Sequence, residues 1–207
     1  MRSIRLLILN LVLLGAAASA QTPPSSAKEV EAIAELWGKG SKPKSSTIST
    51  WRQLIQGDNY AAFQIRADLD LYQFVLSRDQ LTKSIDALKN YQAVFRQAKL
   101  DGDEAVGWLY RTEVRLKRLG DEALDERFIL NVERRKGRHA TLSLTFESWL
   151  LTFLGPDSPA GRAYKGITIQ QSQAVQLQEH LEEIARATAQ SRLTPRSSGA
   201  LTASRQA

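Results

Sequence analysis

The segment from Glu126 to Glu147 alternates apolar and polar side chains with a period of two, and no other feature restricts the fold as strongly. A period of two places alternate side chains on one face of a strand, so we expect two strands that each bury one face. Gly137 lies between the two runs and can adopt the positive φ that a turn needs. The segment is therefore predicted to be a β-hairpin, with a tip that carries four basic residues: Arg134, Arg135, Lys136 and Arg138.

Further strands and two amphipathic helices are predicted on either side of this hairpin. Residues 50–76 are interpreted as two or three strands with one shared apolar face, formed by Phe63, Ile65, Leu69, Leu71 and Val75. A helix follows from about Asp79, and a second helix follows Ser172, because apolar residues recur there at helical spacing. Their apolar stripes are Leu81, Ile85, Leu88, Tyr91 and Phe95 in the first helix, and Ala174, Leu177, Leu181, Ile184 and Ala185 in the second.

Residues 106–117 fit two interpretations. Acidic residues precede this segment, basic residues end it and Gly120 follows, which is typical of helix ends. The alternation of Trp108, Tyr110, Thr112 and Val114 with polar residues favours a long strand, because aromatic and β-branched residues are enriched in strands. We predict the strand, with Trp108 and Tyr110 in the core.

The first 20 residues have the parts of a secretory signal peptide. Arg2 and Arg5 form a basic start, an apolar run follows, and Ala18-Ser19-Ala20 is an A-x-A cleavage signal. An uncleaved anchor is the alternative, but the apolar run is shorter than the ~20 residues of a spanning helix. The chain has no cysteine, so packing alone must hold the exported protein together. We expect a periplasmic or extracellular protein of a bacterium.

The predicted fold class is α+β: a twisted antiparallel sheet with two helices packed on one face, after a short N-terminal helix. That first helix is placed at 27–37, where Val30, Ile33, Leu36 and Trp37 form one stripe. The order of strand, helix cap and helix occurs twice. An alternative organisation is therefore two β-sheet-plus-helix repeats, at 48–99 and 106–190. The predicted organisation is a signal peptide at 1–20, helix and linker at 21–47, an α+β domain at 48–190, and a disordered tail at 191–207.

Residues 126–133, followed by Lys136-Gly137-Arg138 and a strand, resemble the purine-rich-element-binding (PUR) repeat. Residues 165–169 and the helix after them resemble the end of that repeat, and equally the end of related single-strand-binding transcription coactivators. The resemblance implies four curved antiparallel strands and a helix, with single-stranded nucleic acid bound on the sheet. His139 and Ala140 stand where the family prefers bulky apolar residues, and these families act inside cells. The resemblance therefore supports the fold more than the activity.

Catalytic and metal-binding patterns are not found in the sequence. The two histidines, His139 and His180, have no cysteine partner, and His180 with Glu183 supplies too few ligands for zinc, so a solvated helix face is expected there. The sequence carries no nucleophile-elbow, phosphate-loop or zinc-protease motif. We therefore predict no enzyme activity, no catalytic residue and no cofactor or metal.

Basic residues on the predicted outer sheet face are the best candidate for function. Arg111, Arg115 and Lys117 point away from the buried side of their strand, and the hairpin tip lies on the neighbouring strand. Such clusters can meet phosphates or an acidic protein surface, although ordinary solvation of a strand face explains them equally well. The chain is predicted to be an exported non-enzymatic binding or assembly module, with a second copy of itself among its partners. The alternative is a single-stranded nucleic-acid-binding protein of PUR-like fold.

Overall fold

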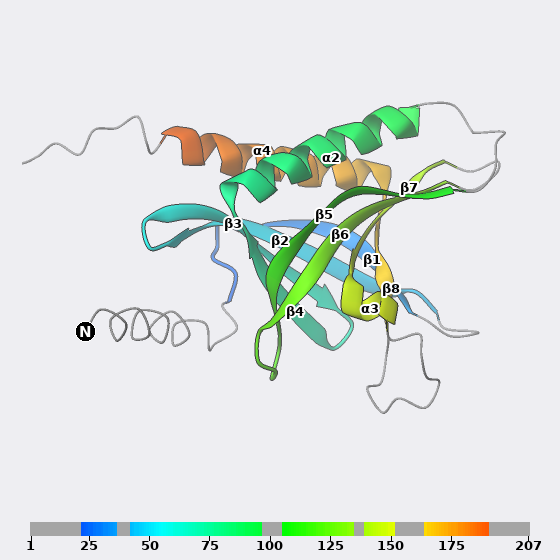
Figure 1. Ribbon diagram of the computed structural model, residues 1–207, viewed down its shortest axis with the longest axis horizontal. Helices are drawn as coiled ribbons and strands as arrows, with labels where there is room; N and C mark the ends of the chain where they lie inside the picture. The colour runs from blue at the N-terminus through cyan, green and yellow to red at the C-terminus, as the bar shows by residue number, and fades with distance from the viewer. Residues whose placement is uncertain (1–21, 37–41, 97–104, 135–138, 152–163, 191–207) are drawn as a thin grey trace, which may run out of the picture.

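The computed structural model describes residues 22–36, 42–96, 105–134, 139–151 and 164–190. Within these ranges the chain forms eight strands and three helices (Figure 1). In chain order they are β1 (Lys28–Leu36), β2 (Lys44–Ile55), β3 (Asp58–Ala67), β4 (Asp70–Leu76), α2 (Arg78–Arg96), β5 (Ala105–Arg118), β6 (Leu124–Arg134), β7 (Thr141–Phe146), α3 (Glu147–Leu151), β8 (Tyr164–Ile169) and α4 (Gln171–Gln190). The signal peptide, the tail and residues 135–138 of the hairpin tip lie outside the described residues.

The eight strands form a closed antiparallel barrel in which each strand pairs with the next and β8 returns to β1. Pairing is long within β1–β4 and within β5–β7, but β4 and β5 pair only at Tyr72 with Arg118 and Gln73 with Lys117. Helix α2 contacts β5 beyond this short seam, where Gln80 Nε2 donates to Thr112 Oγ1 at 2.9 Å. The fold is therefore α+β and antiparallel, as predicted, with a sheet that closes on itself.

Helices α2 and α4 contact each other and run antiparallel above the strands in Figure 1. Most residues of the predicted stripes are buried, with Leu81, Leu88 and Tyr91 at 2% exposure or less in α2, whereas Phe95 and Ala185 are partly buried. Ser77 begins α2 with a reciprocal cap, because its Oγ accepts from the Gln80 amide while its own amide donates to Gln80 Oε1. None of the helices in the described ranges is long and apolar enough to cross a membrane.

One apolar core fills the barrel and continues under the two helices. Phenylalanine rings from β3, β4 and β6 meet within it: Phe63 stacks on its cross-strand partner Phe74 at 4.8 Å between centroids, and the Phe128 centroid lies 5.0 Å from that of Phe74. The alternating residues of the predicted hairpin all contribute to this core, which confirms the hairpin as β6 and β7. Residues 105–118 form strand β5, so the strand interpretation of that segment is confirmed over the helix.

The predicted helix at 27–37 is wrong, because residues 28–36 form strand β1. Val30, Ala32 and Ala34 point into the core at a period of two, while β1 pairs with β2 on one side and β8 on the other. Alanine favours helices in isolation, but the hydrogen bonds and burial supplied by two neighbouring strands override that preference.

The predicted apolar face of residues 63–75 is also wrong beyond Ala67. Asp68 has a φ of 55°, and it forms a two-residue turn with Leu69 that pairs Ala67 with Asp70. A two-residue turn pairs odd with even positions, so β4 buries Tyr72, Phe74 and Leu76 instead of the odd-numbered residues. Leu69 lies in the turn and is 81% exposed.

Candidate binding surfaces

The outward side chains of β5 include the basic residues that the sequence singled out. Arg111 and Arg115 are exposed and Lys117 is half-buried, whereas Val114 and Leu116 between them are buried in the core. On β6, Arg134 belongs to the strand, although its side chain lies outside the described residues, as do Arg135, Lys136 and Arg138. We call the outward residues Trp108, Arg111, Glu113 and Arg115 of β5 with Asp125, Arg127 and Asn131 of β6 the β5–β6 face.

Acidic side chains neutralise part of this face. Arg115 Nη1 lies 3.0 Å from Asp125 Oδ1 across the strand pair, and Arg127 lies 2.8 Å from Glu147 and 3.9 Å from Glu113. Exposed pairs of this kind contribute about 0–1 kcal/mol each, so they set the local charge more than the stability. The described part of the face therefore carries mixed charge, in contrast to the uniformly basic face that was expected.

Trp108 lies on the β5–β6 face with 61% of its surface exposed, so its predicted place in the core is wrong. The register of β5 against β6 shifts between Trp108 and Tyr110, and the extra residue turns the indole to the outside. The Arg111 guanidinium carbon lies 4.6 Å from the centroid of the Trp108 ring, in a cation–π contact. Tyr110 is partly buried against the core, and Phe128 is 1% exposed, as expected for core residues.

The surroundings of Trp108 are polar and lie toward the basic hairpin tip. Its partner on β6 is Asn131, and the row continues through Ser143 on β7 to Thr168 on β8. The Oδ1 atom of Asn131 is buried without a hydrogen-bond partner in the described structure. Because β6 runs from Asn131 to Arg134, the exposed indole lies near the end of β6 at which the basic tip begins.

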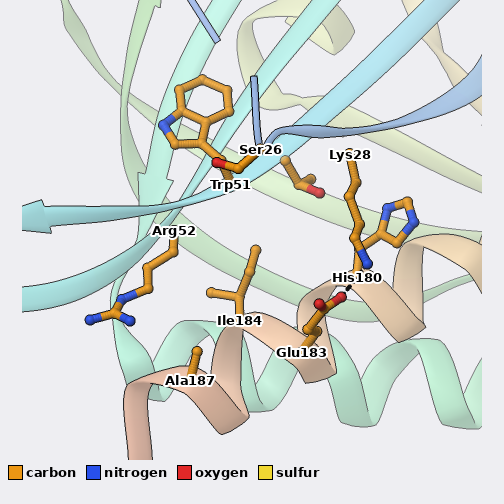
Figure 2. A pocket seen from close by; sticks show the side chains of 9 residues that line it. Ser26, Lys28, Trp51, Arg52, His180, Glu183, Ile184 and Ala187 are labelled. Atoms are coloured by element: carbon orange, nitrogen blue, oxygen red, sulfur yellow. Dashed lines mark hydrogen bonds and ion pairs between the residues drawn. The ribbon is translucent and has the colours of Figure 1, made fainter. Parts of the chain in front are cut away.

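A second candidate site is a pocket between β1, β2 and α4, with a volume of about 160 Å³. Lys28 of β1 and Thr50 of β2 are cross-strand partners at the end of the barrel, and α4 lies over them. Figure 2 shows the lining side chains of α4, including His180 and Glu183, facing those of the two strands. Lys28 Nζ forms an ion pair with Glu183 at the rim, marked by the dashed line.

Two polar atoms that line this pocket have no hydrogen-bond partner within the described residues: Thr50 Oγ1 and His180 Nδ1. Thr50 is only 2% exposed, so water reaches its hydroxyl poorly. Burial, followed by the positive charge of Lys28, lowers the pKa of His180 below its ordinary value of 6.5. The imidazole is therefore neutral near pH 7, with one ring nitrogen donating and the other accepting.

Sequence reasoning missed this pocket for two reasons. His180 was interpreted as part of a solvated helix face, and Lys28 was placed in a helix that is in fact strand β1. The one available signal was the position of His180 between Leu177 and Ile184, two residues of the buried stripe of α4. No group of three or more metal-ligating residues occurs in the described ranges.

Comparisons with known proteins add no relative, because no family model, curated protein or solved structure matches this chain.

Proposed function

We propose that the protein is an exported, non-enzymatic binding or assembly module whose partner contacts the β5–β6 face and the adjoining basic hairpin tip. The residues assigned to binding are Trp108 together with Arg111, Arg115, Lys117, Arg134, Arg135, Lys136 and Arg138. The signal-peptide pattern at the start of the chain supports the exported location.

The exposed indole of Trp108 carries this proposal. A large aromatic side chain that is 61% exposed leaves apolar area in water that a partner could cover. Arg111 lies directly over the ring, and tryptophan and arginine are the residues most enriched at the energetic centres of protein interfaces. The β-bulge beside Trp108 supports the same conclusion, since bulges often re-aim a side chain at a functional site.

The ion pairs of the face indicate which arginines would contribute most to the free energy of binding a partner. Arg115 and Arg127 already have acidic neighbours, so an acidic partner would have to displace these contacts. Arg111 contacts the uncharged ring of Trp108, so a partner could approach it without displacing a carboxylate from that contact. We therefore expect Trp108 and Arg111 to anchor the partner, and the basic tip to add longer-range attraction that weakens with salt.

Single-stranded nucleic acid is the second candidate partner, and the same tryptophan favours it. A base stacked on an aromatic side chain contributes about 1–3 kcal/mol, and neighbouring basic residues can meet the phosphates. The order of elements also supports the PUR-like resemblance, because four strands and a helix are followed by four more strands and a second long helix, with the five-residue helix α3 inserted between β7 and β8. We infer two β-sheet-plus-helix units, β1–β4 with α2 and β5–β8 with α4, whose helices pack together on the same side.

The test for a protein partner is a pull-down from the envelope fraction with the mature chain, comparing wild type with Trp108→Ala and Arg111→Ala. We expect both variants to lose the captured partner. Leu69→Ala is the control, because Leu69 is also an exposed apolar residue, at 81% against 61% for Trp108, and it lies in the turn between β3 and β4. A partner that all three variants retain as well as wild type would contradict the proposal.

The nucleic-acid alternative is tested by titrating a fluorescent single-stranded oligonucleotide at two salt concentrations. Steeply salt-dependent binding that is lost in Arg134→Ala/Arg135→Ala/Lys136→Ala, and weakened in Trp108→Ala, would favour it. Absence of binding even at low salt would remove it and leave the protein partner as the remaining candidate.

A further inference from the structure

We propose that the pocket between β1, β2 and α4 is a binding site for a small organic carboxylate. The pocket is lined mainly by residues of β1, β2 and α4, and none of its lining residues belongs to the β5–β6 face. This proposal therefore does not depend on the proposed function. Its lining includes Thr50 and His180, each with a buried polar atom that has no hydrogen-bond partner in the described residues, and the charged residues Lys28, Arg52 and Glu183.

The unpartnered Thr50 hydroxyl points to a ligand rather than to a structural role. A buried polar group without a hydrogen bond is destabilising, and nearly all such groups in folded proteins have a partner. The neighbouring inward positions of β2 include Ile48, which is fully buried, so an apolar residue could pack at this depth. A hydroxyl at position 50 is therefore useful only if something entering the pocket bonds to it.

The charges around the pocket favour an anion. Lys28 and Arg52 are cationic, whereas Glu183 is the one acidic side chain among the lining residues. Lys28 is paired with Glu183, and Arg52 Nε donates to Asn59 Oδ1 at 2.5 Å, so the lining contains two cationic side chains and one anionic side chain. A carboxylate accepts hydrogen bonds only, and it could accept from the Thr50 hydroxyl and from an N–H of His180.

The size and the apolar lining indicate an organic ligand. A volume of about 160 Å³ is several times the roughly 30 Å³ that one water molecule occupies in the liquid. Ile184 and Ala187 of α4 and Trp51 of β2 add apolar surface to the lining (Figure 2). A carboxylate with a short alkyl chain can place its charged end against Lys28 and Thr50 and its chain against these residues.

Binding of an anion here should be coupled to a proton on His180. The charged groups that face the imidazole are Lys28 from β1 and Glu179 and Glu183 from α4. Lys28 and burial disfavour the imidazolium in the empty pocket, and a bound carboxylate would offset both effects. Affinity should therefore increase as the pH is lowered from 8 toward 6, while the carboxylate ligand stays ionised.

The experiment is a titration of the mature protein with sodium propionate, followed by the NMR signals of the His180 ring, with sodium chloride as the ionic-strength control. We expect saturable shifts with propionate that chloride does not reproduce. Thr50→Val should weaken propionate binding about tenfold, because it removes a hydrogen bond to a charged group. Thr47→Val is the matched control, since it makes the same change on β2 at a residue outside the pocket lining.

His180→Gln provides a second variant that keeps a polar side chain on the surface of α4. It should remove the pH dependence of propionate affinity and leave the thermal stability close to that of wild type. The proposal is overturned if propionate produces no saturable shift beyond chloride, or if Thr50→Val binds propionate as well as Thr47→Val does. Saturation by glycerol but not by propionate would likewise overturn it, because the pocket would then bind hydroxyl groups and not a carboxylate.

Discussion

Trp108 on β5 and Thr50 on β2 depart from the usual rules of burial in opposite directions. Trp108 is a large apolar side chain that is 61% exposed, whereas Thr50 is a polar side chain that is 2% exposed and has no hydrogen-bond partner in the described residues. The first leaves apolar area in water and the second leaves a hydroxyl desolvated, so neither helps the isolated chain to fold. Both proposed binding sites therefore depend on a side chain that is poorly matched to its surroundings in the isolated chain.

The largest expected effect compares Trp108 with an aromatic residue of the core on the neighbouring strand. Phe128 is 1% exposed and lies 5.0 Å from the Phe74 ring, so Phe128→Ala should lower the free energy of unfolding by about 3–5 kcal/mol. Trp108→Ala should change it by no more than about 0.5 kcal/mol. Equilibrium urea denaturation measures both values. A cost of several kcal/mol for Trp108→Ala would mean that the indole stabilises the fold. Trp108 would then differ from Thr50, because it would help the isolated chain to fold.

A smaller effect of opposite sign is expected at Thr50. Thr50→Val replaces an unsatisfied hydroxyl with a methyl group of similar size, so it should raise the free energy of unfolding by about 1 kcal/mol in the absence of ligand. Thr47→Val, at a position that is not fully buried, should be close to neutral. Thermal denaturation of wild type and the two variants in parallel measures these changes in the free energy of unfolding. If Thr50→Val is destabilising, the hydroxyl has a structural partner and the pocket loses its main argument.

The charge balance of the β5–β6 face can be altered by a single substitution. Asp125→Asn removes the acidic partner of Arg115, so affinity for a fluorescent single-stranded oligonucleotide should increase about two- to threefold at low salt. Glu182→Gln on α4 makes the same change in net charge, removes the acidic partner of Lys89 and is the control. An equal increase in both variants would attribute the effect to net charge and not to this face.

The smallest expected effect is on the titration of His180. Lys28→Met removes a positive charge that lowers the pKa of His180, so the pKa should move up toward 6.5. Because the wild-type pKa is lower in the folded than in the unfolded state, the unfolded chain binds more protons, and His180 reduces stability as the pH falls below about 6.5. Lys28→Met should weaken this acid destabilisation, which histidine NMR and denaturation at pH 5 and pH 7 would measure. An unchanged His180 pKa would show that the charge of Lys28 does not affect the imidazole.

The accuracy of sequence reasoning differed between the two regions. The basic residues Arg111 and Arg115 were correctly placed outward, because their strand alternates with buried Val114 and Leu116. Trp108 was misplaced because one inserted residue, the register shift before Tyr110, reverses the side that earlier residues face. The pocket was not predicted at all, since it forms only where β1, β2 and α4 meet, and residues 28 and 183 are far apart in the chain.

The sequence by itself determined the elements whose periodicity is strong, which are the β6–β7 hairpin and the apolar stripes of α2 and α4, and it favoured strand β5 over a helix. These patterns depend on neighbours within a few residues, so they can be interpreted without knowing the fold. Only the tertiary structure decided that 28–36 is a strand, that the sheet closes through β1 and β8, and that Trp108 is exposed while Thr50 is buried. The physical reason is that strand pairing and burial are contributed by distant residues, and their free energy outweighs local preference.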